Sequence, residues 1–357
     1  MARARRLVLK VGSSVLAGDP RSFGRIARDV AAARVSGRAA LIVSSGAIAL
    51  GLQAVGCARR PTSIPLLQAA AAAGQPLLMR RWERAFARHR IAVAQVLLTH
   101  ADFADRRRYL NARRALEALL GRGVVPVLNE NDTVAVDEIR FGDNDQLAAM
   151  TTGLIGADLL VLLSDVAGLE DSSGGRVSVV TDIDREALPL VRRPRKPGLG
   201  SGGMASKLDA ARRATLLGVP VIIARGLGPS ALSSVLAGGD EGTLFLPPRR
   251  PVRSRKHWIG FTLRPRGILA VDEGAAAALR SGKSLLPSGV MEASGEFEAG
   301  DAVTIRSPSG ADVARGLTAY GLTEVLRIKG LHSREIARAL GYESGAEIIH
   351  HDDMVLL

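Results

Sequence analysis

A glycine-rich stretch that ends in a lysine is the part of this 357-residue sequence that most clearly suggests chemistry. It runs from Gly198 to Lys207 and reads GLGSGGMASK. Glycines let backbone N–H groups approach an anion closely, a helix start adds a favourable partial charge, and Lys207 adds a full charge. The stretch therefore predicts a phosphate-binding loop. A surface loop that leads into a helix is the alternative that this motif alone leaves open.

The same stretch does not fit two common nucleotide-binding motifs. Gly198, Gly200 and Gly203 have the spacing of the dinucleotide fingerprint. However, the preceding residues are rich in Arg and Pro instead of strand formers, and no acidic residue follows about 20 positions later. The spacing of a Walker A motif is absent as well. The predicted phosphate site therefore needs a different framework.

Lys10 is the second candidate for binding an anion. It lies in a short apolar β-pattern and is followed by Gly12, Ser13 and Ser14. A lone lysine in a strand commonly lies at a sheet edge and faces water, and that alternative applies here. The Gly-Ser-Ser turn favours the other interpretation. Two of only six lysines then lie in anion-friendly turns, which suits two point charges that hold phosphate groups during phosphoryl transfer.

Two turns rich in amide and carboxylate groups complete the set of polar motifs. They span Asn129–Asp132 and Gly142–Asp145. Such groups can hold the ammonium of an amino acid, orient a lysine or bind metal-associated water. Ordinary turn and helix-cap chemistry is the alternative, since Asp143 and Asn144 are good caps for the helical pattern that follows. Together with Lys10, Ser45 and the glycine loop, the two turns favour a functional site.

The segments that must position these residues alternate between apolar runs and amphipathic patterns. Near-continuous apolar strands alternating with helices predict an α/β fold with a mainly parallel sheet sandwiched by helices. Ligands of such sheets bind beyond the carboxyl ends of the strands, where the polar motifs occur. The predicted strands are 7–11, 40–44, 92–98, 124–128, 158–164, 177–180 and 220–224, and the predicted helices are 23–35, 66–88, 109–120, 145–154 and 207–217.

The pattern changes near residue 248, which predicts a second domain. Residues 249–256 contain Pro and basic residues, and prolines stop helices and extend the residue before them. We interpret residues 1–248 as one domain, 249–256 as a basic linker and 257–357 as a small β-rich domain. In the last part we expect strands at 297–306 and 348–357 and helices at 274–280 and 333–340.

Composition narrows the class of protein further. The single Cys57 cannot form an internal disulfide, and no Cys/His group has zinc-site spacing, so a reducing cytoplasm fits. The longest low-charge stretch, 64–79, is interrupted by polar residues and is shorter than a membrane span. The formal net charge of +13 raises the alternative of an RNA-binding or RNA-modifying protein.

The distribution of charge argues against RNA as a partner. From His257 onward there are 10 Lys and Arg against 13 Asp and Glu, a net charge of −3, whereas the preceding part has 38 against 22, a net charge of +16. A net negative domain with only two tyrosines, Tyr320 and Tyr342, is a poor electrostatic footprint for RNA. We therefore expect RNA binding by this tail to be weak or absent.

The motifs, taken in order, resemble the amino-acid kinase family, and within it the members that phosphorylate glutamate. The tail is similar to a PUA domain, through VDEGA at 271–275 and SLLPSG at 284–289. The two turns Asn129–Asp132 and Gly142–Asp145, together with the tail, argue against aspartate, acetylglutamate or nucleoside-monophosphate members. The motifs that carry the resemblance are VLKVGSSVL at 8–16, VSSGAI at 43–48, LLT at 97–99, LNAR at 110–113, PVLNEND at 126–132, GDND at 142–145 and GSGGMASK at 200–207.

The resemblance implies ATP-dependent phosphorylation of the γ-carboxylate of L-glutamate to γ-glutamyl phosphate, the first step of proline biosynthesis. Mg²⁺ would accompany ATP, with no residue assigned as a metal ligand. A homo-oligomer in the cytoplasm, and the next enzyme, glutamyl phosphate reductase, as a partner, are further expectations.

The resemblance also assigns roles to individual residues. Lys10 and Lys207 would neutralise charge on the transferring phosphoryl group, and Asp145 would orient the two lysines. Glutamate would be held by Ser45, Asp132 and Asn144, with Asn129 and Asp143 close by. The residues implied in ATP binding are Lys10, Ser164, Asp165, Ser201, Gly202, Gly203, Met204, Ala205, Ser206 and Lys207.

Overall fold

The first strand, β1 (Arg6–Val11), lies in the interior of the main sheet. Apart from Lys10 its buried residues are apolar on both faces, the composition of a strand covered by helices on each side. In the computed structural model β1 pairs with β2 (Ala39–Ser44) and β5 (Leu159–Ser164), both in parallel. The structure describes residues 4–19, 21–134, 144–191, 203–228, 231–248, 263–342 and 345–357.

The described residues separate into two compact units, Met1–Pro251 and Val252–Leu357. The first unit contains an eight-stranded sheet of order β3-β4-β2-β1-β5-β7-β8-β6. Every neighbouring pair in this sheet is parallel except β7 and β8. Its remaining strands are β3 (Val93–Leu98), β4 (Val125–Glu130), β6 (Val179–Val180), β7 (Val221–Arg225) and β8 (Thr243–Phe245).

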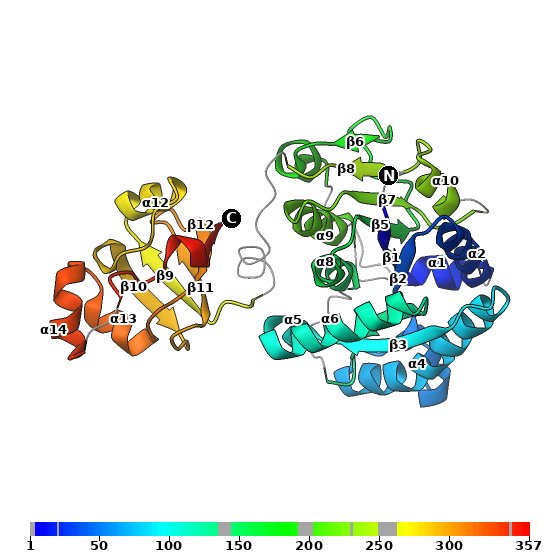
Figure 1. The fold of residues 1–357 in the computed structure, drawn as a ribbon, viewed down its shortest axis with the longest axis horizontal. Helices are drawn as coiled ribbons and strands as arrows, with labels where there is room; N and C mark the ends of the chain where they lie inside the picture. The colour runs from blue at the N-terminus through cyan, green and yellow to red at the C-terminus, as the bar shows by residue number, and fades with distance from the viewer. Residues whose placement is uncertain are drawn as a thin grey trace. The chain divides into compact units, whose positions relative to one another are not determined.

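Helices cover both faces of this sheet, so the expected helix-sandwiched, mainly parallel sheet is confirmed (Figure 1). One face carries α1 (Ser13–Gly18), α2 (Ser22–Val35), α4 (Ile64–Ala87) and α10 (Ala231–Ala237); the other carries α6 (Arg106–Gly121), α8 (Asn144–Ile155) and α9 (Met204–Leu216). Two short helices, α3 (Ala47–Gly51) and α5 (His100–Ala104), follow β2 and β3.

The alternation of side chains along β1 decides where Lys10 points. Leu7, Leu9 and Val11 belong to the core under α2 and α4, whereas Val8 belongs to the core under α8 and α9. Residues two apart in a strand share a face. Lys10 therefore projects on the α8 and α9 side. The alternative of an edge-strand lysine that faces water is wrong, since β1 is central and Lys10 is 7% exposed.

Two glycines let α3 and α4 pack backbone against backbone. A Cβ atom placed on Gly51 would lie 1.8 Å from the carbonyl oxygen of Ala70, and one on Gly74 would lie 1.8 Å from that of Ala47. Atoms cannot approach so closely, so both positions need glycine. Gly46, which caps α3 with φ 111°, needs glycine for its left-handed backbone. These three glycines fix the turn after β2 against α4.

The second unit is the expected small β-rich domain. Its five-stranded sheet has the order β10-β9-β11-β12-β13, and only β9 and β11 pair in parallel. The strands are β9 (Gly267–Val271), β10 (Val290–Gly295), β11 (Ala302–Arg306), β12 (Asp312–Leu317) and β13 (Met354–Leu356); the helices are α12 (Glu273–Arg280), α13 (Leu322–Ile328) and α14 (Ile336–Leu340).

Some element predictions need correction. The expected strands at 297–306 and 348–357 are too long, since the strands there are only β11 and β13. The sequence reading also missed β8 and the strands β9, β10 and β12. The linker expected at 249–256 lies outside the described residues. Among the described helices, none is both long and apolar enough to cross a bilayer.

Candidate active site

The polar motifs meet at the carboxyl end of the main sheet. Lys10 pairs with Val43 in the register of β1 and β2, so Lys10 lies beside the end of β2, which Ser45 follows directly. Ser164 ends β5, on the other side of β1. Asn129 is the second-last residue of β4, which extends to Glu130. The prediction that this strand ends at residue 128 was therefore wrong. This is the edge at which parallel sheets bind ligands.

Asp145 lies between two lysine ammonium groups. Its Oδ1 atom is 2.7 Å from Lys10 Nζ, and its Oδ2 atom is 3.7 Å from Lys207 Nζ. The Asp145 side chain is fully buried, and both lysine side chains are nearly so. The three charged residues come from three different elements: Lys10 from β1, Asp145 from α8 and Lys207 from α9. The group carries a net charge of +1 in a place that excludes most water.

The pKa values of this group reflect burial and mutual attraction. Burial alone would raise the pKa of Asp145, but Lys10 and Lys207 outweigh it and hold that pKa below its ordinary value of 3.8. Burial lowers the pKa of Lys207 below its ordinary 10.5, and Asp145 partly offsets this effect. Asp145 thus stabilises the charged form of Lys207, but burial dominates and Lys207 gives up its proton more readily than a surface lysine.

The first turn of α9 presents backbone groups beside the lysines. Gly203 is the N-cap residue with extended backbone, and Met204, Ala205 and Ser206 lead to Lys207. The Ser206 hydroxyl lies 3.4 Å from Asp145 Oδ2. Free N–H groups at a helix start attract anions. The described end of the glycine loop therefore places a helix start directly before Lys207, while Ser201 and Gly202 lie outside the described residues.

Ser164 and Asp165 lie at the end of β5, and Asp165 lies near Lys207. The Ser164 hydroxyl donates to Asp165 Oδ1 at 2.8 Å at the end of β5. Asp165 is exposed and near enough to Lys207 to raise the pKa of that lysine against the effect of burial. Asp165 is therefore a neighbour of Lys207, and the expected role of Ser164 and Asp165 in ATP binding stays a prediction.

A chain of amide side chains runs away from Asn144, the residue before Asp145. Asn144 Nδ2 donates to Ser45 Oγ at 2.9 Å and to Asn129 Oδ1 at 3.0 Å. Asn129 donates to Gln75 Oε1 at 3.0 Å, and Gln75 donates to Gln95 Oε1 at 3.2 Å. Asn144 Oδ1 is buried and has no hydrogen-bond partner among the described residues. It is an acceptor that a ligand with N–H groups would satisfy.

Gln75 and Gln95 are the site residues that the sequence reading missed. Gln75 interrupts the apolar pattern of α4 and is only 8% exposed, and Gln95 interrupts the pattern of β3. A polar residue inside an apolar helical stripe is the signal that could have revealed Gln75, because buried amides need partners. Trp82, two turns further along α4, donates from Nε1 to Ser44 Oγ at 2.9 Å and steadies the turn before Ser45.

Asp132 occupies a neighbouring hollow and does not join the amide chain. It lines a cavity of about 190 Å³ together with Gln75, Gln95 and Glu130. Burial raises the pKa of Asp132 to about 6, and the Arg60 guanidinium opposes this only in part. The structure therefore brings Asp132 to the Gln75 side of the cluster. Asp143, the other expected carboxylate, lies outside the described residues.

Known proteins are similar in sequence to this chain over its whole length. Residues 5–225 match the model of the amino acid kinase family, and residues 267–340 match the PUA domain. The glutamate 5-kinase of Geobacter sulfurreducens is 47% identical over 373 residues, which cover 100% of this chain and 99% of the relative. That of Thermus thermophilus is 46% identical over 361 residues, with 99% and 97% covered.

A solved structure, carbamate kinase from Giardia lamblia bound to AMP-PNP, aligns with a TM-score of 0.49 at 16% identity, over 69% of this chain and 99% of that one. The assignment depends instead on the sequence matches, which extend over the full chain at 44–47% identity in several species. The chain therefore belongs to the amino acid kinase family, as a kinase of its glutamate 5-kinase branch with a C-terminal PUA domain.

Proposed function

We propose that this chain transfers the terminal phosphoryl group of ATP to the γ-carboxylate of L-glutamate and releases ADP and γ-glutamyl phosphate, the first step of proline biosynthesis. The observation that carries the proposal is the position of two adjacent residues at the start of α8. Asp145 holds the two lysines, and Asn144 holds the amide and hydroxyl cluster with Ser45 and Asn129. A site for phosphate charge and a site for an amino acid thus share one helix end.

The reaction needs charge neutralisation more than proton transfer. A γ-carboxylate with a pKa of about 4.3 is already ionised at neutral pH, so one of its oxygens attacks the phosphorus without a general base. As the new P–O bond forms, the bond to ADP breaks and the electron pair leaves with ADP. Lys10 and Lys207 would offset the negative charge of the phosphoryl group, and the N–H groups at the start of α9 would add to this.

Glutamate would lie against the amide cluster. The buried Asn144 Oδ1 and the Asp132 carboxyl are acceptors suited to the α-ammonium group, and Ser45 and Asn129 would hold the rest of the backbone end of glutamate. Asp143 remains an expectation for the same role. ATP would lie along the first turn of α9 and beside Ser164 and Asp165.

Mg²⁺ would enter with ATP on its phosphate oxygens. The fully buried carboxylate of the site, Asp145, already faces two ammonium groups, which makes it a poor ligand for a further cation. We therefore assign no side chain as a metal ligand. The ion would supply charge neutralisation at the phosphates, and this chain's own residues would align the two substrates.

Glutamate-dependent consumption of ATP is the direct test of the proposal. The purified chain with ATP, Mg²⁺ and L-glutamate should release ADP, and hydroxylamine should trap the acyl phosphate as the γ-glutamyl hydroxamate. Aspartate and N-acetylglutamate are the matched controls, because each keeps a carboxylate but changes the length or removes the ammonium. Equal turnover with either control would contradict the assignment to glutamate.

Acidification should weaken glutamate binding through Asp132. A carboxyl with a pKa of about 6 is mostly ionised at pH 7 and mostly protonated at pH 5. If the ionised form holds the ammonium, KM for glutamate should rise by up to about tenfold over this interval, in proportion to the lost carboxylate. An Asp132→Asn enzyme should have a high KM at both values of pH. A variant whose KM still rises with acid as in the parent would exclude Asp132 as the cause.

The remaining partners follow from the same proposal. The product is an acyl phosphate that water attacks, so delivery to glutamyl phosphate reductase, the enzyme that consumes it, is advantageous. We place the enzyme in the cytoplasm and propose a homo-oligomer. We propose no RNA ligand for the C-terminal domain, because from His257 onward its formal charge is −3.

A further inference from the structure

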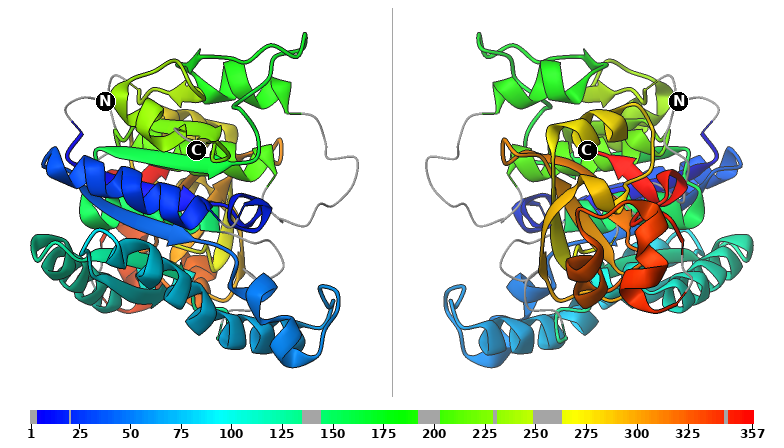
Figure 2. Two further views of the ribbon diagram at one scale, coloured as in Figure 1. Left: turned by 90° about the vertical axis from the view of Figure 1, so that its right-hand side faces the viewer. Right: turned by 90° about the vertical axis from the view of Figure 1, so that its left-hand side faces the viewer.

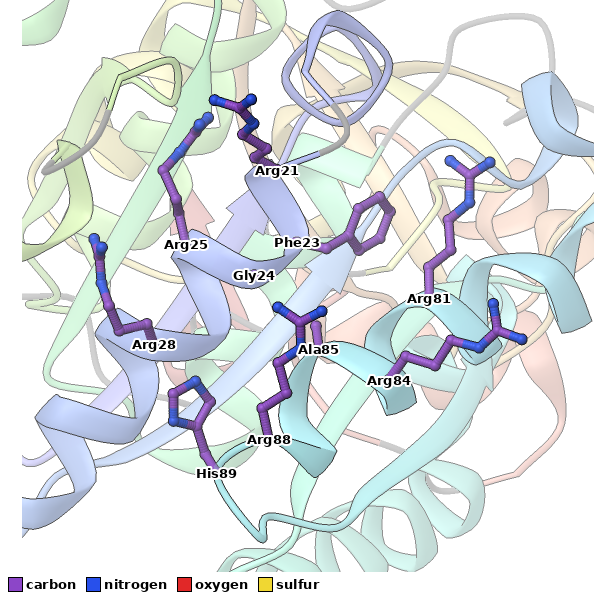
Figure 3. A pocket seen from close by; sticks show the side chains of 10 residues that line it. All are labelled: Arg21, Phe23, Gly24, Arg25, Arg28, Arg81, Arg84, Ala85, Arg88 and His89. Atoms are coloured by element: carbon purple, nitrogen blue, oxygen red, sulfur yellow. The ribbon is translucent and has the colours of Figure 1, made fainter.

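An arginine-lined groove lies between α2 and α4, on the face of the sheet opposite to the lysine pair. Its volume is about 710 Å³, within the usual range of about 300–1,000 Å³ for small-molecule sites. Arg21, Arg25 and Arg28 line it from α2 and the residue before it, and Arg81, Arg84 and Arg88 line it from the end of α4, beside His89 (Figure 3). Among the lining residues there is no Asp or Glu.

The spacing of these arginines places them on one face of each helix. Positions 21, 25 and 28, like 81, 84 and 88, recur at three- and four-residue intervals, so each set forms a row. Figure 2 shows α2 lying across the front of the sheet in the left view, with α4 close beside it. The two rows therefore line one groove from two walls, and their like charges repel one another.

Only part of this positive charge is balanced within the described residues. Arg25 pairs with Asp19 at 2.6 Å, and Arg28 pairs with Asp29 at 3.0 Å. For Arg81, Arg84 and Arg88 the described residues provide no ion pair; Arg81 instead lies over the Phe23 ring, 5.9 Å from its centre. A counter-charge from outside the chain would relieve the repulsion between the walls.

The partial charges at helix ends account for the arginines at the end of α4 but not for those at the start of α2. Arginines in the last turn of α4 offset the partial negative charge of that helix end. Arg21 is the N-cap residue of α2 and Arg25 lies in its first turn, where the partial charge is positive and disfavours cations. An anion between the walls would interact favourably with both the arginines and the start of α2.

We propose that this groove binds a small anion with two or more adjacent phosphates, such as a nucleotide polyphosphate or another polyphosphorylated metabolite. Several guanidinium groups on opposite walls match several phosphates, since each arginine can bind phosphate oxygens through two N–H groups. The concave shape and limited volume favour a small molecule over a flat macromolecular surface. This site is separate from the proposed ATP site.

The floor of the groove is linked to the glutamate side of the active site. Phe23 packs edge-on against Trp82 with ring centres 4.8 Å apart, and Trp82 donates to Ser44 Oγ at 2.9 Å. Ser44 directly precedes Ser45. Trp82 is one of two tryptophans in the chain, so a Trp258→Phe background makes its fluorescence a local reporter of the groove.

The test is calorimetric titration of the full chain with inorganic tripolyphosphate. Three proteins are compared: the parent, Arg84→Gln/Arg88→Gln, and the control Arg107→Gln/Arg114→Gln, which removes two exposed arginines of α6 and the same amount of charge. Binding of tripolyphosphate at the ATP site is common to all three. The groove variant should lose one binding event or weaken it at least about tenfold, while the control should stay within about twofold.

Several outcomes would overturn the proposal. These are equal binding by all three proteins, equal weakening in the control, or orthophosphate binding as tightly as tripolyphosphate. Tighter binding of a DNA duplex than of tripolyphosphate, lost in the groove variant, would assign the groove to nucleic acid instead. Retained glutamate-dependent turnover verifies the fold of each variant. If Arg84→Gln/Arg88→Gln fails to fold, Arg21→Gln/Arg88→Gln removes one arginine from each wall, and the same difference from the control is required.

Discussion

A Lys207→Ala enzyme is expected to have a kcat at least about 10²-fold below that of the parent, because removal of one preorganised charge donor costs a reaction of this type about 10²–10³ in rate. Lys207 lies 3.7 Å from Asp145 and is nearly buried, so its ammonium acts where water cannot replace it. Asp145 keeps its closer contact with Lys10 in the variant, and the fold should survive. KM for glutamate should change little, since Lys207 is absent from the amide cluster.

The measurement is steady-state turnover in the hydroxamate assay, with circular dichroism to verify folding. Arg212→Ala is the matched control, because it removes a positive charge from the same helix, where Arg212 makes only a partly exposed ion pair with Asp184 at 3.2 Å. Its kcat should stay close to the parent value. Unchanged turnover in Lys207→Ala would remove this lysine from the mechanism.

Replacement of Asp145 by asparagine is expected to reduce both activity and stability. The amide has almost the same shape, but it leaves two buried ammonium groups with no anion between them. Breaking a buried ion pair in this way costs about 3–5 kcal/mol of unfolding free energy. Lys10 already lowers the pKa of Lys207, and without Asp145 that pKa should fall further. Turnover should therefore be low at neutral pH and recover in part as acid restores the proton on Lys207.

Urea unfolding and a pH–rate profile test the two parts of this prediction. Asp184→Asn is the control, because it removes an exposed carboxylate whose ion pair with Arg212 contributes less than about 1 kcal/mol. The pKa of Asp145 in the folded chain is below its ordinary value of 3.8. Its contribution to the free energy of unfolding of the parent is therefore complete above about pH 3.8 and is lost as the pH falls further. Parent-like stability in Asp145→Asn would mean that the lysines do not depend on it.

The parallel core of the fold could be predicted because its strands are apolar on both faces. Strands such as β1 and β5 appear in the sequence as nearly unbroken apolar runs. Their first and last residues agree with the predictions to within about one residue. By contrast, β8 has only three residues, Thr243–Phe245, and exists because β7 and β6 lie on either side of it. Such a strand is defined by its neighbours, which a local pattern does not contain.

The site was predictable where a residue type is unusual for its position. Lys10 inside an apolar strand and Lys207 after glycines are both conspicuous, and the structure places them around Asp145. Gln75 was not recognised, because one glutamine in a long alanine- and leucine-rich helix also fits an exposed position. In the structure Gln75 is buried and accepts a hydrogen bond from Asn129, which lies 54 positions further along the chain. Contacts such as this one, between residues of different elements, arise from tertiary packing, so a local sequence pattern does not predict them.

The contact between Gly51 and Gly74 has a consequence for how this enzyme can change over evolutionary time. Replacing a helical glycine by alanine ordinarily gains about 1 kcal/mol, so chance substitution and consensus design both favour it. Here a single added methyl group on either residue would push α3 and α4 apart, since it would meet a carbonyl oxygen at 1.8 Å. Ser45 lies just before α3 and Gln75 lies next to Gly74, so such a substitution would move two members of this hydrogen-bonded chain. A glycine-to-alanine substitution that would stabilise the helix elsewhere is therefore excluded at Gly51 and Gly74, because it would displace residues of the proposed amino-acid site.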